Sequence, residues 1–217
     1  MQIAIALYPE FTSLDAMGPY QVLQYTPGAE TFFVAETAGL VRDDHGELAV
    51  EVTRTFDQVR APDVVVIPGG TITRTMAHEG HPLTEWIRSV HPTTTWTTSV
   101  CTGALMLGAA GLLHGLTATT HWQAVADLEA HGATYTEQRV VRQGRIITGA
   151  GVSAGIDMAL TLLAEVAGDG VAQGVQLAIE YDPQPPFDSG APSKADPALV
   201  EFIVAIGEEK QAEIRGR

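Results

Sequence analysis

The chain has 217 residues, of which 45% are hydrophobic, and a formal net charge of −14. This length and apolar content suffice for a substantial core, which predicts a globular protein rather than a disordered one. The balance of 26 acidic against 12 basic residues argues against binding nucleic acid or an anionic membrane through a general electrostatic field.

The sequence also predicts the cellular compartment of the protein. No apolar run reaches the roughly 18 residues that span a bilayer. Residues 1–8 have no basic start and no small-residue cleavage site, so we expect a first strand there and no signal peptide. Cys101 is the only cysteine, and one cysteine forms no internal disulfide, which favours the cytoplasm.

The first half of the chain alternates between strand-like and helix-like segments. In chain order we expect a strand at 3–7, a helix at 14–25 capped by Ser13, strands at 31–36, 47–53 and 63–67, a helix at 82–90 and a strand at 94–100. Residues 63–67 are continuously apolar and β-branched after the first position, which is typical of a parallel strand covered on both faces. The alternation predicts an α/β fold with helices on both faces of a mostly parallel sheet.

The second half continues the same pattern. We expect helices at 103–113 and 122–131, a hairpin at 139–148 that turns at Gln143–Gly144, and helices at 156–167, 171–181 and 196–215. The prolines in segment 182–187 exclude a helix and predict an extended chain. No internal repeat and no linker divides the sequence, so we predict a single domain over residues 1–217.

Cys101 lies where the strand at 94–100 meets the helix that follows. A thiol on the first turn of a helix faces unpaired N–H groups and the positive end of the dipole. This environment lowers a thiol pKa and favours the reactive thiolate. A lone cysteine is more often a small buried hydrophobic residue, but the placement between strand and helix favours a nucleophile elbow.

A glycine turn follows the strand at 63–67. The carboxyl ends of parallel strands meet at one edge of a sheet, so we expect Gly69 and Gly70 to lie near Cys101. Their backbone N–H groups, with that of Thr102, are candidate donors to a developing negative charge. The simpler interpretation is that the glycines only permit a sharp turn.

These residues together resemble the ThiJ/PfpI superfamily of flavodoxin-like proteins, which have a class I glutamine amidotransferase-like domain. The matching segments are Val66–Gly70, Ser99–Gly103 and Ala109–Leu113, and the resemblance extends from Ile3 to Phe187. The isocyanide hydratase branch is most similar. Its stretches are matched by Leu14–Pro19, Thr119–Trp122, Thr148–Asp157, Gln176–Tyr181 and Pro185–Phe187.

The resemblance implies that Asp15 is the acid beside Cys101, where other branches place a glutamate. An acid at a helix start also simply complements the dipole, and Glu10 is the nearest alternative acid. The resemblance further implies a homodimer that converts an isocyanide and water to an N-substituted formamide through a Cys101 thioimidate. Asp15 is expected to relay the proton, and the Thr102 hydroxyl to bond near the thiolate or orient water.

Other side chains are weaker candidates. His121 is a possible base, but a lone histidine at a strand end is more often structural, and a carboxyl group already suffices. Trp122 and Ile156 are candidates for the pocket or the core. His78 and His81 lack the spacing of a zinc helix, and Gly149–Gly151 lacks a full dinucleotide-binding motif. We therefore predict no metal, no organic cofactor and a small-molecule substrate.

Two other functions stay open from the sequence. One is a cofactor-free glyoxalase or aldehyde-handling lyase on the same scaffold. The other is a redox- or ligand-sensing domain without enzymatic activity, because an exposed reactive thiol is readily oxidised. After Phe187 we expect one amphipathic helix and no helix-turn-helix pair, which makes a DNA-bound form of such a sensor the less favoured expectation.

Overall fold

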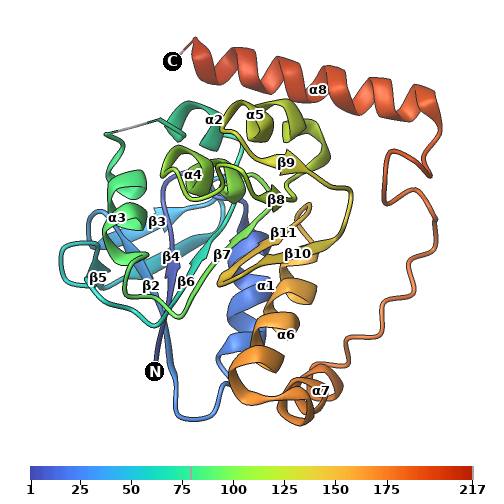
Figure 1. Ribbon diagram of the computed structural model, residues 1–217. Coiled ribbons are helices and arrows are strands. Elements are labelled where there is room, and N and C mark those ends of the chain that lie inside the picture. The colour runs from blue at the N-terminus through green and yellow to red at the C-terminus, as the bar shows by residue number, and fades with distance from the viewer. Residues whose placement is uncertain (79, 217) are drawn as a thin grey trace.

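A seven-stranded sheet forms the centre of the protein in the computed structural model, which describes residues 1–78 and 80–216. The strand order is β10–β11–β7–β6–β1–β2–β5, and every neighbouring pair is parallel except β10 with β11 (Figure 1). The central order β2–β1–β6–β7–β11 is that of the flavodoxin-like doubly wound fold. The strands are β1 (Gln2–Ala6), β2 (Glu30–Ala35), β5 (Arg54–Thr55), β6 (Val64–Ile67), β7 (Trp96–Val100), β10 (Val140–Gln143) and β11 (Ile146–Gly149).

Helices cover both faces of this sheet (Figure 1). Helices α1 and α6 lie side by side on one face, and α3 and α4 pack together on the other. The predicted α/β class, mostly parallel sheet and flanking helices are therefore confirmed. The helices are α1 (Ser13–Leu23), α2 (Thr73–Met76), α3 (Pro82–Val90), α4 (Gly103–Ala109), the 3₁₀ turn η1 (Trp122–Ala124), α5 (Val125–Ala130), α6 (Ala154–Ala167), α7 (Asp169–Ala178) and α8 (Pro197–Arg215).

The apolar runs form the strands at the centre of the core. All four residues of β6 are fully buried, as are Ala4 to Ala6 of β1. Because these strands lie under helices on both sides, neither face can be polar, and the sequence shows no alternation. The carboxyl ends of β1, β6, β7 and β11 consequently meet at one edge, where the following loops come together.

The structure corrects several predicted boundaries. Ser13 is the first residue of α1 and does not cap it; the N-cap is Thr12, which makes no capping hydrogen bond and whose hydroxyl donates to Asp44 at 2.9 Å. Helix α4 ends at Ala109, well before residue 113, and Gly111 has a φ of +79°, a conformation that ends a helix.

Several short elements were not predicted. They are α2, β5, β3 (Gly39–Arg42), which pairs with the predicted strand β4 (Ala49–Val52), and the pair β8 (Thr117–Ala118) with β9 (Thr134–Tyr135). Each has two to four residues, too few for a hydrophobic period to identify it. Strand β4 confirms the strand predicted at 47–53, with shorter bounds.

The C-terminal helix α8 lies across the top of the molecule in Figure 1. A largely exposed segment, residues 179–196, connects it to α7. Ile214 is the only buried residue of α8, and Phe202 remains 60% exposed. No helix in the described ranges 1–78 and 80–216 is long and apolar enough to cross a membrane.

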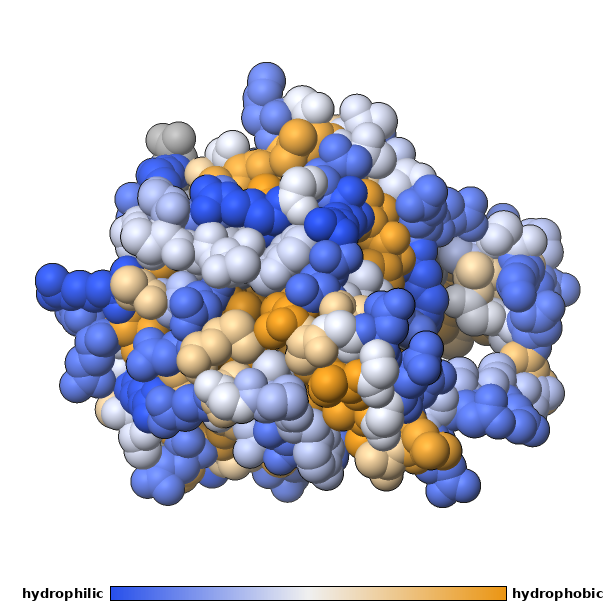
Figure 2. Space-filling model, turned by 60° about the horizontal axis from the view of Figure 1, so that its bottom comes forward, coloured by the Kyte–Doolittle hydropathy of each residue, from blue (hydrophilic) through white to orange (hydrophobic). Residues whose placement is uncertain are grey.

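The face presented in Figure 2 is mainly hydrophilic, with apolar side chains exposed in several separate groups.

We predict that Gly103→Ala destabilises the fold by about 3 kcal/mol or more, because overpacking against rigid backbone is costly. A Cβ at this position would lie 2.1 Å from the Ile67 carbonyl oxygen. Gly174 in α7 is the matched control: a Cβ there meets nothing within 4 Å, so Gly174→Ala should stabilise by about 0.5–1 kcal/mol. Urea unfolding of both variants checks this, and equal effects would contradict the close approach of α4 to β6.

Candidate active site

Cys101 forms a strained elbow between β7 and α4. Its φ is +57°, a left-handed conformation that non-glycine residues adopt only when the surroundings enforce it. Its N–H lies within hydrogen-bonding distance of the carbonyls of Ala150, at 2.8 Å, and Gly149, at 3.1 Å. The Thr120 hydroxyl donates to the Cys101 carbonyl at 2.9 Å. Two loops therefore hold the elbow in place from both sides.

Asp15 lies in the first turn of α1 and is fully buried. Its Oδ2 accepts a hydrogen bond from the Gly69 N–H at 2.8 Å. A Cβ on Gly69 would lie 2.7 Å from this oxygen and 2.7 Å from the Thr102 hydroxyl oxygen, so only glycine allows this approach. The other oxygen, Oδ1, is buried without a hydrogen-bond partner among the described residues.

Burial raises the pKa of Asp15 from 3.8 to about 7. Hydrogen bonds from the Gly69 N–H and the Cys101 thiol lower it in part, and the charge of Asp44 raises it further. A carboxyl group with a pKa near neutrality can both accept and release a proton during a reaction.

Burial also raises the pKa of the Cys101 thiol well above 9, and the charge of Asp15 raises it further. Hydrogen bonds from the backbone N–H groups of Thr102 and Val152 to the sulfur oppose this rise. The expectation of a lowered thiol pKa at the helix start is therefore wrong for the resting site, because desolvation outweighs the nearby N–H groups. The raised pKa of the thiol favours S–H over thiolate in the resting site.

The glycine turn plays a different part from the one predicted. The Gly69 N–H donates to Asp15, and the Gly70 N–H donates to the Thr102 hydroxyl oxygen at 3.0 Å. The Thr102 hydroxyl in turn donates to the Gly70 carbonyl at 3.0 Å. These groups are engaged in the resting structure, so they fix Asp15 and the turn rather than standing open as anion donors. The Thr102 N–H does face the sulfur.

A cavity of about 820 Å³ comes close to the elbow through residues next to Cys101, and neither Cys101 nor Asp15 is among its lining residues. His121 and Trp122 line it, together with Thr120 and Val152, which contact Cys101. Its outer wall includes residues 190–193 of the C-terminal segment. Ile156 does not line this cavity, and its Cγ1 would lie 3.1 Å from a Cβ on Gly18 of α1. It therefore belongs to the packing between α1 and α6.

His121 is engaged in a structural contact. Its Nδ1 accepts a hydrogen bond from the Gln123 N–H at 3.3 Å and caps the η1 turn. Burial lowers its pKa, and the nearby charge of Arg74 lowers it further, which favours the neutral ring. Glu10 lines a different cavity, with Leu7 and Leu83. Asp15 is therefore the acid that lies next to Cys101.

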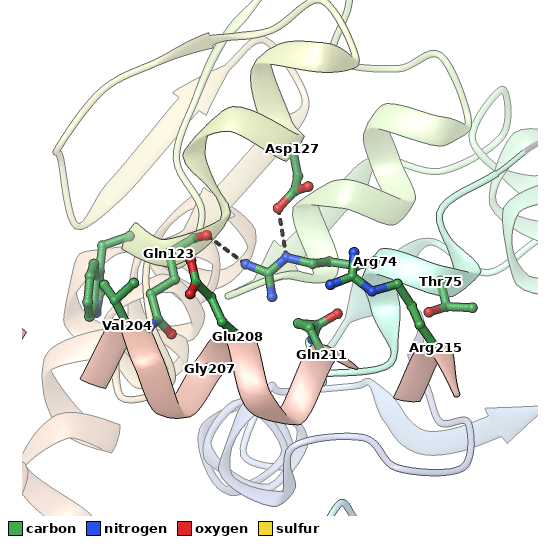
Figure 3. A pocket seen from close by; sticks show the side chains of 10 residues that line it. Arg74, Thr75, Gln123, Asp127, Val204, Gly207, Glu208, Gln211 and Arg215 are labelled. Atoms are coloured by element: carbon green, nitrogen blue, oxygen red, sulfur yellow. Dashed lines mark hydrogen bonds and ion pairs between the residues drawn. The ribbon is translucent and has the colours of Figure 1, made fainter. Parts of the chain in front are cut away.

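A second cavity, of about 540 Å³, lies between α8 and helices α2 and α5. Figure 3 shows Arg74 reaching across it to Asp127, at 2.7 Å, and to the Gln123 carbonyl, at 2.6 Å. Gln211 also donates to the Thr71 carbonyl at 2.8 Å. The charge of Arg74 is thus compensated within the body of the protein, and the Gln211 contact attaches α8 to it.

His78 and His81 lie close together just before α3. The His78 and His81 rings meet edge to face, with centroids 5.7 Å apart, and His81 Nδ1 accepts from the Leu83 N–H at the start of α3. Glu79, between them, lies outside the described residues. Within residues 1–78 and 80–216, no group of three or more potential metal ligands comes together.

Three residues of the site were missed by sequence reasoning. Val152 donates its N–H to the sulfur, Thr120 holds the elbow, and Tyr8 lies close enough for Asp15 and Cys101 to affect its pKa. Val152 acts through its backbone, and no residue type signals such a role. Tyr8 follows the strand expected at 3–7, so its place at the carboxyl edge of the sheet was the one available signal. Thr120 lies between the helices expected at 103–113 and 122–131, where no strand was expected, so no predicted strand end pointed to it.

The doubly wound sheet and the buried Asp15–Cys101 pair agree with the family that the sequence matches. The sequence pattern of the DJ-1/PfpI family matches residues 1–165, and this chain belongs to that family. It is 43% identical to an isonitrile hydratase of Pseudomonas putida over 201 residues, 93% of this chain and 87% of that protein.

Other relatives agree on the family. The crystal structure of a ThiJ/PfpI family protein from Pseudomonas syringae superposes with a TM-score of 0.88 at 38% identity, covering 98% of this chain and 90% of that one. A deglycase of Pyrococcus horikoshii is 26% identical over 163 residues, 68% of this chain and 89% of that protein.

We predict that Asp15→Asn stabilises the fold at neutral pH. The folded pKa of Asp15, about 7, exceeds its ordinary value of 3.8, so the stability that the protonated acid contributes is present below about pH 4 and lost as the pH rises through 7. The stability advantage of Asp15→Asn over the wild type should therefore grow by about 2–3 kcal/mol between pH 5 and pH 8. Urea unfolding at both pH values measures it, and a constant difference would contradict the raised pKa.

Proposed function

We propose that this protein is a hydro-lyase that converts an isocyanide, R–N≡C, and water to an N-substituted formamide. The observation that carries the proposal is the buried Asp15–Cys101 pair, whose neighbours Thr120 and Val152 line an 820 Å³ cavity. The 43% identity to isonitrile hydratase supports the same reaction class. The isocyanide carbon is electrophilic toward a soft sulfur nucleophile, and Cys101 supplies the one thiol in the chain.

In the first step the sulfur of Cys101 bonds to the isocyanide carbon. The Asp15 carboxylate accepts the thiol proton as the S–C bond forms and delivers it to the same carbon. The product is a thioimidate, R–N=CH–S–Cys101, and the S–H bond is the only bond of the enzyme that breaks. An acid with a pKa of about 7 suits both halves of this transfer.

In the second step water adds to the thioimidate carbon, with its hydroxyl going to carbon and a proton to nitrogen. The tetrahedral adduct, R–NH–CH(OH)–S–Cys101, then collapses as the C–S bond breaks. The hydroxyl proton returns to sulfur through Asp15, and R–NH–CHO leaves. Isocyanide and water are consumed, and the thiol and carboxylate are restored.

The surrounding groups support these steps. The N–H groups of Thr102 and Val152 stabilise negative charge on sulfur as the proton leaves. The unpartnered Oδ1 of Asp15 is available to carry the proton. His121 and Trp122 line the space for the substituent on nitrogen. This route uses no metal and no organic cofactor.

We also propose a cytoplasmic homodimer that binds neither nucleic acid nor membrane. The free thiol of Cys101 fits a reducing compartment, and the net charge of −14 disfavours anionic partners. Helix α8 exposes Leu199, Phe202 and Ile206, each at least 44% accessible, which supports a covered face. Light scattering at micromolar concentration checks the dimer, and a monomer would contradict it.

We predict that the wild-type protein produces a formamide from cyclohexyl isocyanide and that Cys101→Ala does not. Cys101→Ser is the size-matched variant and should lose about a thousandfold in kcat/KM or more. A serine hydroxyl is a far weaker nucleophile than a thiol, because Asp15 cannot readily remove its proton. Product formation is followed by chromatography, and circular dichroism checks that each variant is folded.

The same assay distinguishes the alternative functions. Turnover by Cys101→Ala would contradict the covalent route. Methylglyoxal consumption without isocyanide turnover would favour a glyoxalase or aldehyde-handling lyase, the class that the deglycase relative brings into consideration. No turnover of either, with reversible oxidation of Cys101, would favour a sensing domain.

We predict that kcat/KM rises with pH through an apparent pKa of about 7. Asp15 must be ionised to accept the thiol proton, and its raised pKa places that ionisation near neutrality. The apparent pKa belongs to the Asp15–Cys101 pair. A pH–rate profile from about pH 5 to pH 9 measures it, and a rate that is flat across this range would contradict the role of Asp15.

A further inference from the structure

Tyr8 is a buried tyrosine that the proposed steps do not use. It follows β1, is only 5% exposed, and donates its hydroxyl hydrogen bond to the Pro68 carbonyl at 2.7 Å. Within the described residues, no other hydrogen bond to this carbonyl is found. The partner of Tyr8 is therefore the first half of the glycine turn that faces Asp15.

The Pro68 carbonyl and the Gly69 N–H belong to one peptide unit. The chain has no cis peptide bond in its described part, and in a trans peptide the C=O and N–H groups point in opposite directions from one rigid plane. Tyr8 binds the carbonyl side of this plane at 2.7 Å, and Asp15 Oδ2 binds the N–H side at 2.8 Å. Rotation of the plane would break both contacts together.

We propose that Tyr8 is a positioning residue, whose hydroxyl fixes the Pro68–Gly69 peptide so that the Gly69 N–H stays aimed at Asp15. Tyr8 touches no reacting atom in this arrangement and acts through the peptide. Its kinetic consequence rests on the proposed function, whereas its effect on the ionisation of Asp15 does not.

The groups around Asp15 indicate the direction of the effect. The Gly69 hydrogen bond lowers the pKa of Asp15, the Cys101 thiol hydrogen bond also lowers it, and the charge of Asp44 raises it. Burial raises the pKa of Tyr8 well above 10, so its hydroxyl is neutral throughout the working range. Removing that hydroxyl therefore changes no charge, and its effect on Asp15 must come through the Gly69 N–H.

The test is Tyr8→Phe, studied by ¹³C NMR of the aspartate carboxyl groups, with the Asp15 signal assigned by its loss in Asp15→Asn. The midpoint of the Asp15 titration should move from about 7 upward by about one pH unit, since a hydrogen bond to a charged group is worth that order of free energy. In the isocyanide assay the acid limb should move by the same amount, with kcat near pH 7 reduced several-fold and KM unchanged.

Thr98→Val is the matched control. The Thr98 hydroxyl is also fully buried and donates to a backbone carbonyl, that of Val65, at 3.0 Å, but this contact has no link to Asp15. Both variants should lower the melting temperature, and only Tyr8→Phe should move the Asp15 midpoint. An unchanged midpoint in folded Tyr8→Phe, or an equal movement in Thr98→Val, would overturn the proposal.

A second measurement uses the unaltered protein and tests the Gly69–Asp15 half of the link even if Tyr8→Phe does not fold. The Gly69 amide resonance should titrate with the same midpoint as the Asp15 carboxyl, because the two are hydrogen-bonded at 2.8 Å. A Gly69 resonance that stays constant through this titration would overturn the link. Absence of isocyanide turnover, with both NMR results as expected, would contradict the proposed function and leave the positioning role supported.

Discussion

The site depends on the burial of two ionisable groups against each other. Water is excluded from both the Asp15 carboxyl and the Cys101 thiol, so each is harder to ionise than in solution, and the charge of Asp15 makes the thiol harder still. The hydrogen bonds from Gly69, Thr102 and Val152 offset part of this penalty. The raised pKa values keep a proton available to this pair near neutral pH, which the proposed addition of a thiol across an isocyanide carbon requires.

The parallel sheet makes this burial possible. Strands β1, β6, β7 and β11 end at the same edge, so loops from four parts of the chain enclose Cys101 without any long-range insertion. The packing tolerates almost no side chain at Gly69 or Gly103, where a Cβ would come within 2.7 Å or less of neighbouring atoms. The glycines thus set the distances on which the chemistry depends, and the strained φ of Cys101 is held by the Ala150 carbonyl and the Thr120 hydroxyl.

The sequence predicts the sheet and the elbow well, because runs such as residues 64–67 and the step from β7 into α4 are local signals. Asp15 was identified by family resemblance, since an acid in a first helical turn is common. Val152, Thr120 and Tyr8 were missed, because their contacts join loops far apart in the chain. The direction of the thiol pKa was also mispredicted: the helix start is visible in the sequence, but the desolvation that outweighs it arises only when the loops close over Cys101.

The most direct test of the account is the covalent intermediate itself. Rapid quenching of the wild-type protein with excess cyclohexyl isocyanide, followed by intact and peptide mass spectrometry, should show one added isocyanide on the peptide that contains Cys101. The adduct should persist longer at acid pH, where Asp15 is protonated and the later proton transfers are slow, and should be absent from Cys101→Ala. Formamide production by a wild-type protein that never carries this adduct would contradict nucleophilic catalysis by Cys101.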